Sequence, residues 1–573
     1  MSGDTLVYDM SSMSEGTPQV FVKKDWLNIL DNQNGNYNGN QCVIDTSQLA
    51  NSNKYMNYRE AYLAVPMVLT ASKTTAGATA IITDPTQTAT SIDYAFGLKN
   101  WFGSIIHSFT LDYNGTTIIQ QTPYVGMWNT FRLLTTLSKQ DVITNGAQMG
   151  FYPDDPLSWG FSSAGNNAGK GTYNNIDALA FPTVSGRFGG YNTGNEGFLR
   201  RQQYIMYDPN ALSGGGASGA QTLGDAYSSL LSEAGAIQQY KSYVAKTATS
   251  IQYNIMAIIQ LKHIHNFFQN VPLLKGVFMK MTLNLNQSSL TVGQANGGVL
   301  GTVPLTINSP LGGVSPIMIA SASTASGSSA GFDFDDATAT SVMTVSLAVG
   351  NKPIVPSQVG IVGGLLPNVQ LYVPAYTFNP SFEDAYLSSP VKTVVYTDIY
   401  QYQVNSVSSG AQFNQLLTNG IANIKSVLIV PFLTSTANAG ISPIASPFCG
   451  DGAGTTAPLG LLTNFNVVVA GQNMIYNTER YSYEQFMNQL QGANAVNADM
   501  TDGLTSSLID KLGFENEYCY YYVDCSRMLP VEEAVPKSVS IIGTNSCAKE
   551  LQFFCFIEYG VQVSIDVLTG ARV

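Results

Sequence analysis

The stretch YLAVPMVLT at residues 62–70 recurs in altered form as VLIVPFLT at residues 427–434. Each stretch is an apolar run with one proline at the matching place, and Pro66 and Pro431 are 365 positions apart (431 − 66). Short apolar runs of this kind are typical of buried β-strands. The pair therefore indicates that one β-rich design occurs twice in the chain.

Two further pairs of segments extend this match in the same order along the chain. The segment YNGTTIIQQTPYVGMWNTFRLL at 113–134 resembles VAGQNMIYNTERYSYEQFMNQL at 469–490. The identical residues, each 356 positions apart, are Gly115 and Gly471, Ile119 and Ile475, Thr122 and Thr478, and Leu134 and Leu490. Val271-Pro272 and Val535-Pro536 each precede another apolar run. A constant order with drifting spacing is what we expect of a duplicated domain whose loops have diverged.

Composition supports a large protein with little surface charge. A chain of 573 residues is expected to form at least two domains. Hydrophobic residues make up 45% and charged residues only 11%, whereas about a quarter of an average soluble domain is charged. Uncharged surface is typical of subunits that pack side by side, because charges are depleted at interface cores. A neutral β-protein with long polar loops is the other interpretation.

The charge balance and the termini exclude several functional classes. The net charge is −12 and the sequence pI is near 4.7, without a basic arm, so we expect no direct sequence-specific binding of nucleic acid. No signal peptide and no apolar stretch of the ~18 residues needed for a transmembrane segment is visible, which predicts synthesis in the cytosol. The six cysteines match no zinc pattern, and Cys519, Cys525 and Cys555 are expected to be buried thiols.

Local patterns predict the elements of each half. Asn114-Gly115 between two alternating runs predicts a β-hairpin. Apolar residues at helical spacing predict two short amphipathic helices, which carry Met127, Trp128, Phe131 and Leu134 in the first half and Tyr483, Phe486, Met487 and Leu490 in the second. We also expect a strand at 253–261, a short helix within 226–247, and separate strands at LQFFCFIEYG and VQVSIDVL. Many short strands with few helices predict an all-β sandwich in each half, and the eight-stranded jelly roll is one such architecture.

These patterns divide the chain into an arm and two β-domains. Residues 1–18 are the N-terminal arm, residues 19–382 the first domain, and residues 383–573 the second, with the join expected near 379–390. The first domain carries two long loop insertions, at about 140–225 and 287–345, which are rich in small and polar residues.

Candidate chemical sites are few. His263 and His265 would lie on one face of a strand and offer two metal ligands, but no third ligand is near, so a polar turn is the favoured interpretation. The loop GNNAGKGT from Gly165 lacks the Ser or Thr that follows the lysine of a phosphate loop, since Gly171 follows Lys170. GGGASG at Gly214 is equally weak as a dinucleotide signature, and Asp333, Asp335 and Asp336 are interpreted as a solvated loop rather than a calcium site. We therefore assign no catalytic, cofactor-binding or metal-binding residue and no cofactor.

In combination, these blocks resemble a known family. Two jelly-roll-like halves, the segment at 113–134 and the closing run RMLPVEEAVPKSVSIIGTNSCAKELQFFCFIEYGVQVSIDVLTG at 527–570 are similar to double jelly-roll major capsid proteins, in particular those of polinton-like viruses and virophages. The resemblance extends from about Val20 to the C-terminus and is weakest in the two insertions. It implies two tandem eight-stranded jelly rolls with short helices, and no enzymatic activity.

The resemblance also implies partners and a location. Three chains would form a homotrimer, a pseudo-hexameric capsomer that tiles the icosahedral shell of a double-stranded DNA virus beside neighbouring capsomers, penton proteins and minor capsid proteins. The protein would be made in the host cytoplasm or a virus factory and reside in the virion. The insertions would form outward towers or lock the trimer. The alternative is an all-β glycan-binding adhesin or glycan-active enzyme, which explains the Tyr and Asn content but not the ordered duplication.

Overall fold

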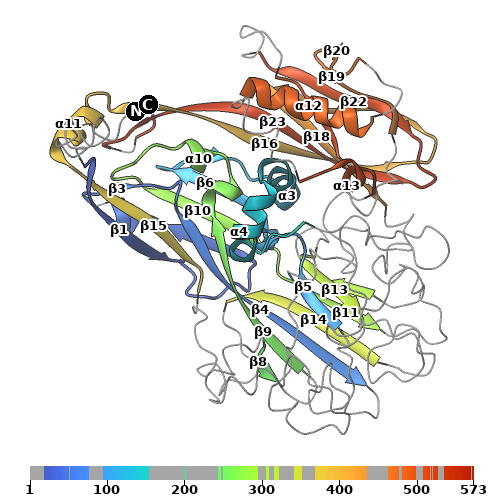
Figure 1. Ribbon diagram of the computed structural model, residues 1–573, viewed down its shortest axis with the longest axis horizontal. Helices are drawn as coiled ribbons and strands as arrows, with labels where there is room; N and C mark the ends of the chain where they lie inside the picture. Colours follow the sequence, from blue (N-terminus) through green and yellow to red (C-terminus); the bar gives the residue numbers. More distant parts are fainter. Residues whose placement is uncertain are drawn as a thin grey trace, which may run out of the picture.

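The structure of the protein is a computed structural model, and the description covers most of both halves of the chain (Figure 1). The described residues are 19–50, 52–75, 94–153, 201, 243–246, 250–293, 305–308, 315–321, 341–350, 368–434, 462–476, 481–497, 508–516, 518, 520–526, 535–569 and 571–573.

Eight strands of the first half form two four-stranded layers, which make up its jelly roll. The first layer has the order β1 (Phe21–Leu30), β15 (Gln370–Phe378), β4 (Tyr62–Thr75) and β9 (Ser250–Gln260). The second layer has the order β2 (Gln41–Asp45), β10 (Met279–Leu285), β6 (Ile106–Tyr113) and β7 (Thr116–Ile119). All of these pairs are antiparallel. Counted along the chain, the two layers have strand orders 1-8-3-6 and 2-7-4-5.

The second half repeats this arrangement strand for strand. One layer has the order β16 (Val391–Val407), β23 (Leu551–Asp566), β18 (Ile424–Leu433) and β21 (Tyr521–Asp524). The other has the order β17 (Gln412–Ile421), β22 (Lys537–Asn545), β19 (Leu462–Val469) and β20 (Gln472–Asn473). Counted along the second half, the orders are again 1-8-3-6 and 2-7-4-5. The expected fold class, two tandem eight-stranded jelly rolls, is confirmed.

The matched sequence segments lie in equivalent elements. Pro66 lies in β4 and Pro431 in β18, which are the third strand of each jelly roll. The predicted hairpin at Asn114-Gly115 joins β6 to β7, and Ala470-Gly471 joins β19 to β20. Both turns have positive φ at both central residues, 46° and 80° in the first and 50° and 82° in the second. The same two-residue turn therefore closes the same hairpin twice.

Both predicted amphipathic helices are present, at the same place in each jelly roll. Helix α3 (Val125–Thr136) follows β7, and helix α12 (Tyr483–Asn497) follows β20. Trp128 and Phe131 of α3 are each 3% exposed, as their helical spacing predicts. The other helices are short: α2 (Ser47–Ala50), η1 (Phe102–Ile105), α4 (Lys139–Met149), α9 (Leu261–Ile264), α10 (Phe267–Asn270), α11 (Pro380–Leu387) and α13 (Lys511–Asn516). Among the described residues, no helix has the length and apolar content needed to span a bilayer.

The first jelly roll carries additional strands within its long connections. They are β3 (Tyr55–Met56), β5 (Tyr94–Leu98), β8 (Tyr243–Lys246), β11 (Ser288–Gly293), β12 (Leu305–Asn308), β13 (Ile317–Ser321) and β14 (Ser341–Val349). Strands β14, β11 and β12 extend the first layer by pairing along the outer part of β4. Strands β11 and β12 of the insertion at 287–345 therefore continue the sheet through β14, whereas β13 pairs with β5 in a separate two-stranded sheet.

Several local predictions were wrong. The insertion at 140–225 begins in helix α4, whose start is fixed by a capping box between Ser138 and Asp141. Residues 243–246 form strand β8, whereas a helix was expected within 226–247. LQFFCFIEYG and VQVSIDVL form the single strand β23, because Gly560 stays in register opposite Thr397. Strand β17 was not predicted, since its sequence QFNQLLTNGI is mostly polar.

Candidate functional site

The two jelly rolls are joined by a seam in which α3 of the first covers the outer face of a sheet of the second. The ring of Phe131 lies 5.1 Å from that of Tyr520 and 5.3 Å from that of Tyr522, beside β21. Trp128 lies 6.3 Å from Phe556 of β23, and Tyr124 lies 4.9 Å from Phe554. All of these distances separate ring centroids. Such aromatic pairs contribute about 0.5–1.5 kcal/mol each beyond the area they bury.

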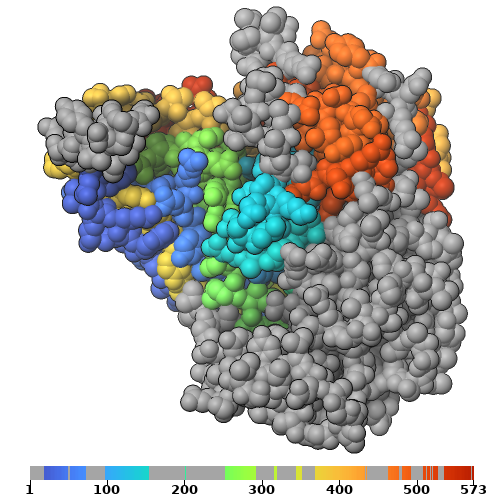
Figure 2. All heavy atoms as spheres, viewed as in Figure 1, coloured from blue at the N-terminus to red at the C-terminus, as the bar shows by residue number. Residues whose placement is uncertain are grey.

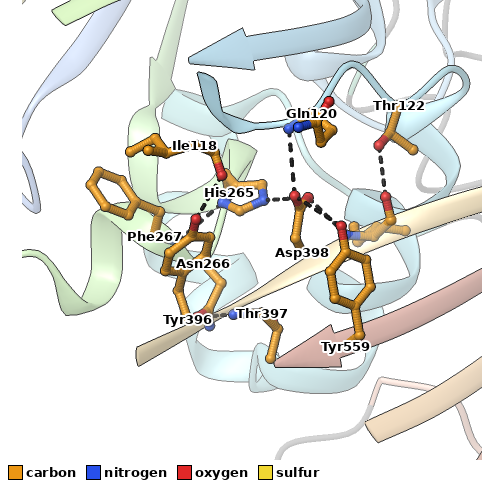
Figure 3. A network of polar contacts seen from close by, with 11 residues as sticks. Ile118, Gln120, Thr122, His265, Asn266, Phe267, Tyr396, Thr397, Asp398 and Tyr559 are labelled. Carbon is orange, nitrogen blue, oxygen red and sulfur yellow. Dashed lines mark hydrogen bonds and ion pairs between the residues drawn. The ribbon is translucent and has the colours of Figure 1, made fainter. Parts of the chain in front are cut away.

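A buried polar cluster lies at the same seam and is centred on Asp398 of β16 (Figure 3). His265 Nε2 lies 3.3 Å from Asp398 Oδ1, and the backbone N–H of Phe267 donates to His265 Nδ1 at 3.1 Å. Because Nδ1 accepts a hydrogen bond, it carries no proton, so Nε2 carries the proton and donates it to Asp398. The segment that follows α9 therefore holds the imidazole in one tautomer, against the second jelly roll.

Asp398 accepts hydrogen bonds from both jelly rolls. The backbone N–H of Gln120, just after β7, donates to Oδ2 at 3.4 Å, and the hydroxyl of Tyr559 in β23 donates to Oδ2 at 3.3 Å. The backbone N–H of Ile399 donates to Oδ1 at 2.8 Å. Burial, followed by the charge of Asp398, raises the pKa of Tyr559. A buried carboxylate with four donors is satisfied, so this cluster is suited to holding two domains together rather than to binding a ligand.

Side chains of the first jelly roll also cover the free edge of β16. Strand β16 ends its sheet, with β23 on one side only. The amide of Asn270 donates to the carbonyl of Val395 at 3.0 Å, and the N–H of Thr397 donates to Asn266 Oδ1 at 3.3 Å. The hydroxyl of Thr122 donates to the carbonyl of Ile399 at 2.8 Å. These contacts replace a neighbouring strand and protect an edge that would otherwise be open to pairing.

The expected pair of histidines does not form a common site. His263 lies in helix α9, not in a strand, and its ring packs edge-on against Trp101 with 6.5 Å between centroids. Burial, followed by the charges of Lys262 and Arg132, lowers the pKa of His263 to about 4. His265 ends the same helix and is directed to Asp398 instead (Figure 3). The described residues contain no group of three or more His, Cys, Asp or Glu side chains suited to a metal ion.

The other candidate segments lie outside the described residues. These are the loops at Gly165 and Gly214, the acidic residues Asp333, Asp335 and Asp336, and Cys519. Cys525 and Cys555 are buried free thiols, as expected, and burial raises the pKa of each. Asp398 was not singled out by sequence, although one carboxylate within the aromatic strand VVYTDIYQYQV was a usable signal, because buried charges require partners.

No protein-family model and no curated protein sequence matches the chain. Solved structures do resemble it. A chain in the cryo-EM structure of the Sputnik virophage superposes with a TM-score of 0.50 at 10% identity, over 97% of this chain and 89% of that chain. The Faustovirus major capsid protein (TM-score 0.42, 10% identity, 97% and 94%) and the mavirus major capsid protein (0.37, 11%, 100% and 94%) are also similar.

The resemblance inferred from sequence and the strand orders of the two halves agree. The chain has a double jelly-roll fold that resembles the fold of viral major capsid proteins.

Proposed function

We propose that the chain is a major capsid protein that forms homotrimers, and that these pseudo-hexameric capsomers tile the icosahedral shell of a double-stranded DNA virus. The observation that carries the proposal is the repeated strand order, 1-8-3-6 and 2-7-4-5, in two sandwiches joined side by side. A threefold trimer of such chains would present six similar sandwiches around its axis. Its outline would be close to sixfold, which suits close packing of identical units into a sheet or shell.

The surface and the seam are consistent with a structural role. Charged residues make up only 11% of the chain, which suits packing between subunits. Asp398 joins the two halves through His265 and Gln120, and it also accepts hydrogen bonds from Tyr559 and Ile399 of its own jelly roll. A carboxylate with these four donors suits a structural role better than that of a catalytic base. In this proposal the two jelly rolls are residues 19–382 and 383–573, preceded by the arm at 1–18, and α11 occupies the join.

The proposal extends to partners and location. Neighbouring capsomers would contact the flanks of each trimer, while penton and minor capsid proteins would complete the shell in the virion. The role is structural rather than enzymatic.

The experiment is to measure the mass of the purified full-length protein by light scattering and to image the same peak by negative stain. The expected result is a particle of three chains, about 184 kDa (3 × 61.4), with a hexagonal outline. A monodisperse monomer of 61.4 kDa would contradict the proposal and favour the glycan-binding or glycan-active alternative, which glycan-array binding would then test.

A further inference from the structure

The sheet face that the seam covers in the second jelly roll has an equivalent face in the first jelly roll that remains partly exposed. Inside one chain, the first jelly roll covers the outer face of the sheet β16-β23-β18-β21 of the second. The equivalent sheet of the first jelly roll, β1-β15-β4-β9, has an outer face that the described residues leave partly exposed. We propose that this face, on β1, β15 and β4, receives the second jelly roll of another copy of the chain, so that the seam repeats between chains. The inference rests on the trimer proposed above and names its contact surface.

The register of the strands places an aromatic surface on this face. Trp26 of β1 lies opposite Pro374 of β15, and Lys24 lies opposite Tyr376. The Trp26 ring is 5.6 Å from Tyr62, which stacks on Tyr372 at 5.1 Å between centroids. We call Trp26, Tyr62, Tyr372 and Tyr376 the aromatic face. Trp26 is 50% exposed, whereas Phe554 and Phe556, on which α3 and Tyr124 pack, are 1% and 0% exposed.

The residue types of the two sheet faces differ in a way that fits their proposed roles. The covered face presents Phe554 and Phe556, which have no polar atom, together with the buried Tyr522. The aromatic face presents Tyr and Trp, whose polar atoms tolerate water before assembly. The hydroxyl of Tyr372 donates to Gln370 at 2.8 Å, and that of Tyr376 donates to Glu60 at 3.1 Å. Tyr and Trp are also the residues enriched at interfaces between subunits.

The edge of β1 supports the same assignment. Among the described strands, β1 ends its sheet as β16 does, and its pairing partner is β15. Asn266, Asn270 and Thr122 cover the edge of β16. Within the described part of the chain, no backbone or side-chain donor fills the same role along β1. The charged residues Lys23, Lys24 and Asp25 of β1 disfavour pairing of a further strand, whereas its exposed Val22, Trp26 and Leu30 offer apolar surface on which another chain can pack.

The surface that would dock on the aromatic face follows from the repeat. In the first jelly roll, the seam is built by the residues after β7, by α3 and by the residues before β10. In the second, the same places are the residues after β20, helix α12 and the residues before β22. They present Tyr476, Met487 and Val535, of which Tyr476 and Val535 are exposed and Met487 is partly buried.

The two proposed surfaces lie at opposite sides of one molecule. In Figure 2 the blue surface that contains β1 lies at the left, and the orange surface that contains α12 lies at the upper right, with the cyan α3 and α4 between them. Two different patches on opposite sides make a heterologous contact, which generates a closed ring when the rotation between copies closes. This is the geometry that a trimer requires.

The test compares Trp26→Glu with Leu416→Glu in the full-length protein. Trp26 is 50% exposed and Leu416 is 49% exposed, so both changes should leave the isolated chain folded. Leu416 lies in β17, at the edge of its sheet opposite β20, and belongs to neither of the proposed surfaces. Light scattering over a dilution series should show that Trp26→Glu and Met487→Glu weaken the trimer about tenfold or more, while Leu416→Glu leaves it unchanged.

Each result has a distinct meaning. Trimers that survive both Trp26→Glu and Met487→Glu would overturn the inferred surface while leaving the capsid proposal intact. A wild-type monomer would instead contradict the proposed function. Hydroxyl-radical footprinting measures the exposure of side chains in the unmodified trimer. Because it needs no variant, it tests the surface even if a substituted chain fails to fold. Protection of Trp26, with Leu416 reactive, supports the inference, and oxidation of Trp26 at the rate of a half-exposed tryptophan overturns it.

Discussion

At the scale of single residues, His263 and His265 lie two positions apart but have different surroundings. His265 is fixed by the N–H of Phe267 and by Asp398, so its hydrogen bonds belong to the seam. His263 packs against Trp101, and its Nδ1 is a buried atom without a hydrogen-bond partner. A proton on His263 would therefore be buried without compensation, beside the positive charges of Lys262 and Arg132.

This environment predicts an acid-sensitive step in stability. The pKa of His263 falls from 6.5 to about 4 on folding, so the unfolded chain binds more protons between these values. The stabilisation is complete above pH 6.5 and is lost as the pH falls toward 4. At pH 5 the loss should be about 2 kcal/mol. Urea unfolding at pH 7 and pH 5 should show this loss in the wild type and a smaller loss in His263→Leu. Equal losses in both proteins would contradict the assignment.

Residue-level prediction from sequence succeeded for the core, whereas the face that each matched proline takes was not predicted. Trp128, Phe131 and the Asn114-Gly115 turn behave as their spacing indicates, because amphipathic periodicity and positive φ are local properties. Pro66 and Pro431 lie in equivalent strands, and each is flanked by two core residues, Val65 and Met67 in one strand and Val430 and Phe432 in the other. Which face a residue takes depends on the register with partners far along the chain, and no short stretch encodes that register.

At the scale of elements, α3 serves two jelly rolls at once. It follows β7 of the first sandwich and packs its aromatic side chains on β21 and β23 of the second. Its Arg132 is partly buried, and the charge of Glu558 in β23 opposes the lowering of the arginine pKa that burial causes. Helix α3 therefore belongs to the first jelly roll by connection and also covers a sheet of the second.

Truncation of Trp128 should be strongly destabilising. Trp128→Ala removes a ring that is 3% exposed and opens a cavity between the two jelly rolls, at an expected cost of about 3–5 kcal/mol. Thr136→Ala, on the exposed end of the same helix, is the matched control and should change stability by no more than ~0.5 kcal/mol. Chemical denaturation of the two variants measures both values. A fully stable Trp128→Ala protein would show that α3 does not carry the seam.

Elements without a hydrophobic signature escaped prediction. Strand β17 has the sequence QFNQLLTNGI and lies at a sheet edge, where one face and one edge remain in water, so pairing with β22 rather than burial holds it. The hydrogen bonds that cover the edge of β16 were also not predicted. They come from Asn and Thr side chains in connections that lie about 130 and 280 residues earlier in the chain. Composition identifies such residues as turn formers and says nothing about which distant strand they reach.

At the scale of the whole molecule, duplication was the property that sequence predicted best. Three matched segments in constant order implied two similar sandwiches, and the strand orders of the two halves agree with that. The side-by-side relation of the sandwiches was not visible in sequence, because a seam is formed by contacts between residues such as His265 and Asp398, 133 positions apart. The contact proposed between copies of the chain follows the pattern of this seam: equivalent elements would meet in the same way.

The net charge of the chain predicts how assembly beyond the trimer responds to salt. With 26 basic and 38 acidic residues, every chain carries −12, so approaching copies of the proposed trimer should repel one another. Raising the ionic strength from 0.01 M to 1 M shortens the Debye length from about 30 Å to about 3 Å. Growth of particles larger than the trimer, followed by light scattering, should therefore accelerate as sodium chloride is added.

The proposed trimer itself should respond weakly to salt, because the aromatic face that would form its contact consists mainly of apolar ring surface, and screening does not weaken apolar contacts. Sucrose at matched osmolality is the control, since it changes water activity without screening charge. Growth that slows on adding salt would show that attraction between oppositely charged groups, rather than contact between uncharged flanks, joins one trimer to the next. The direction of this single response therefore separates the two ways in which a chain with so few charges could tile a shell.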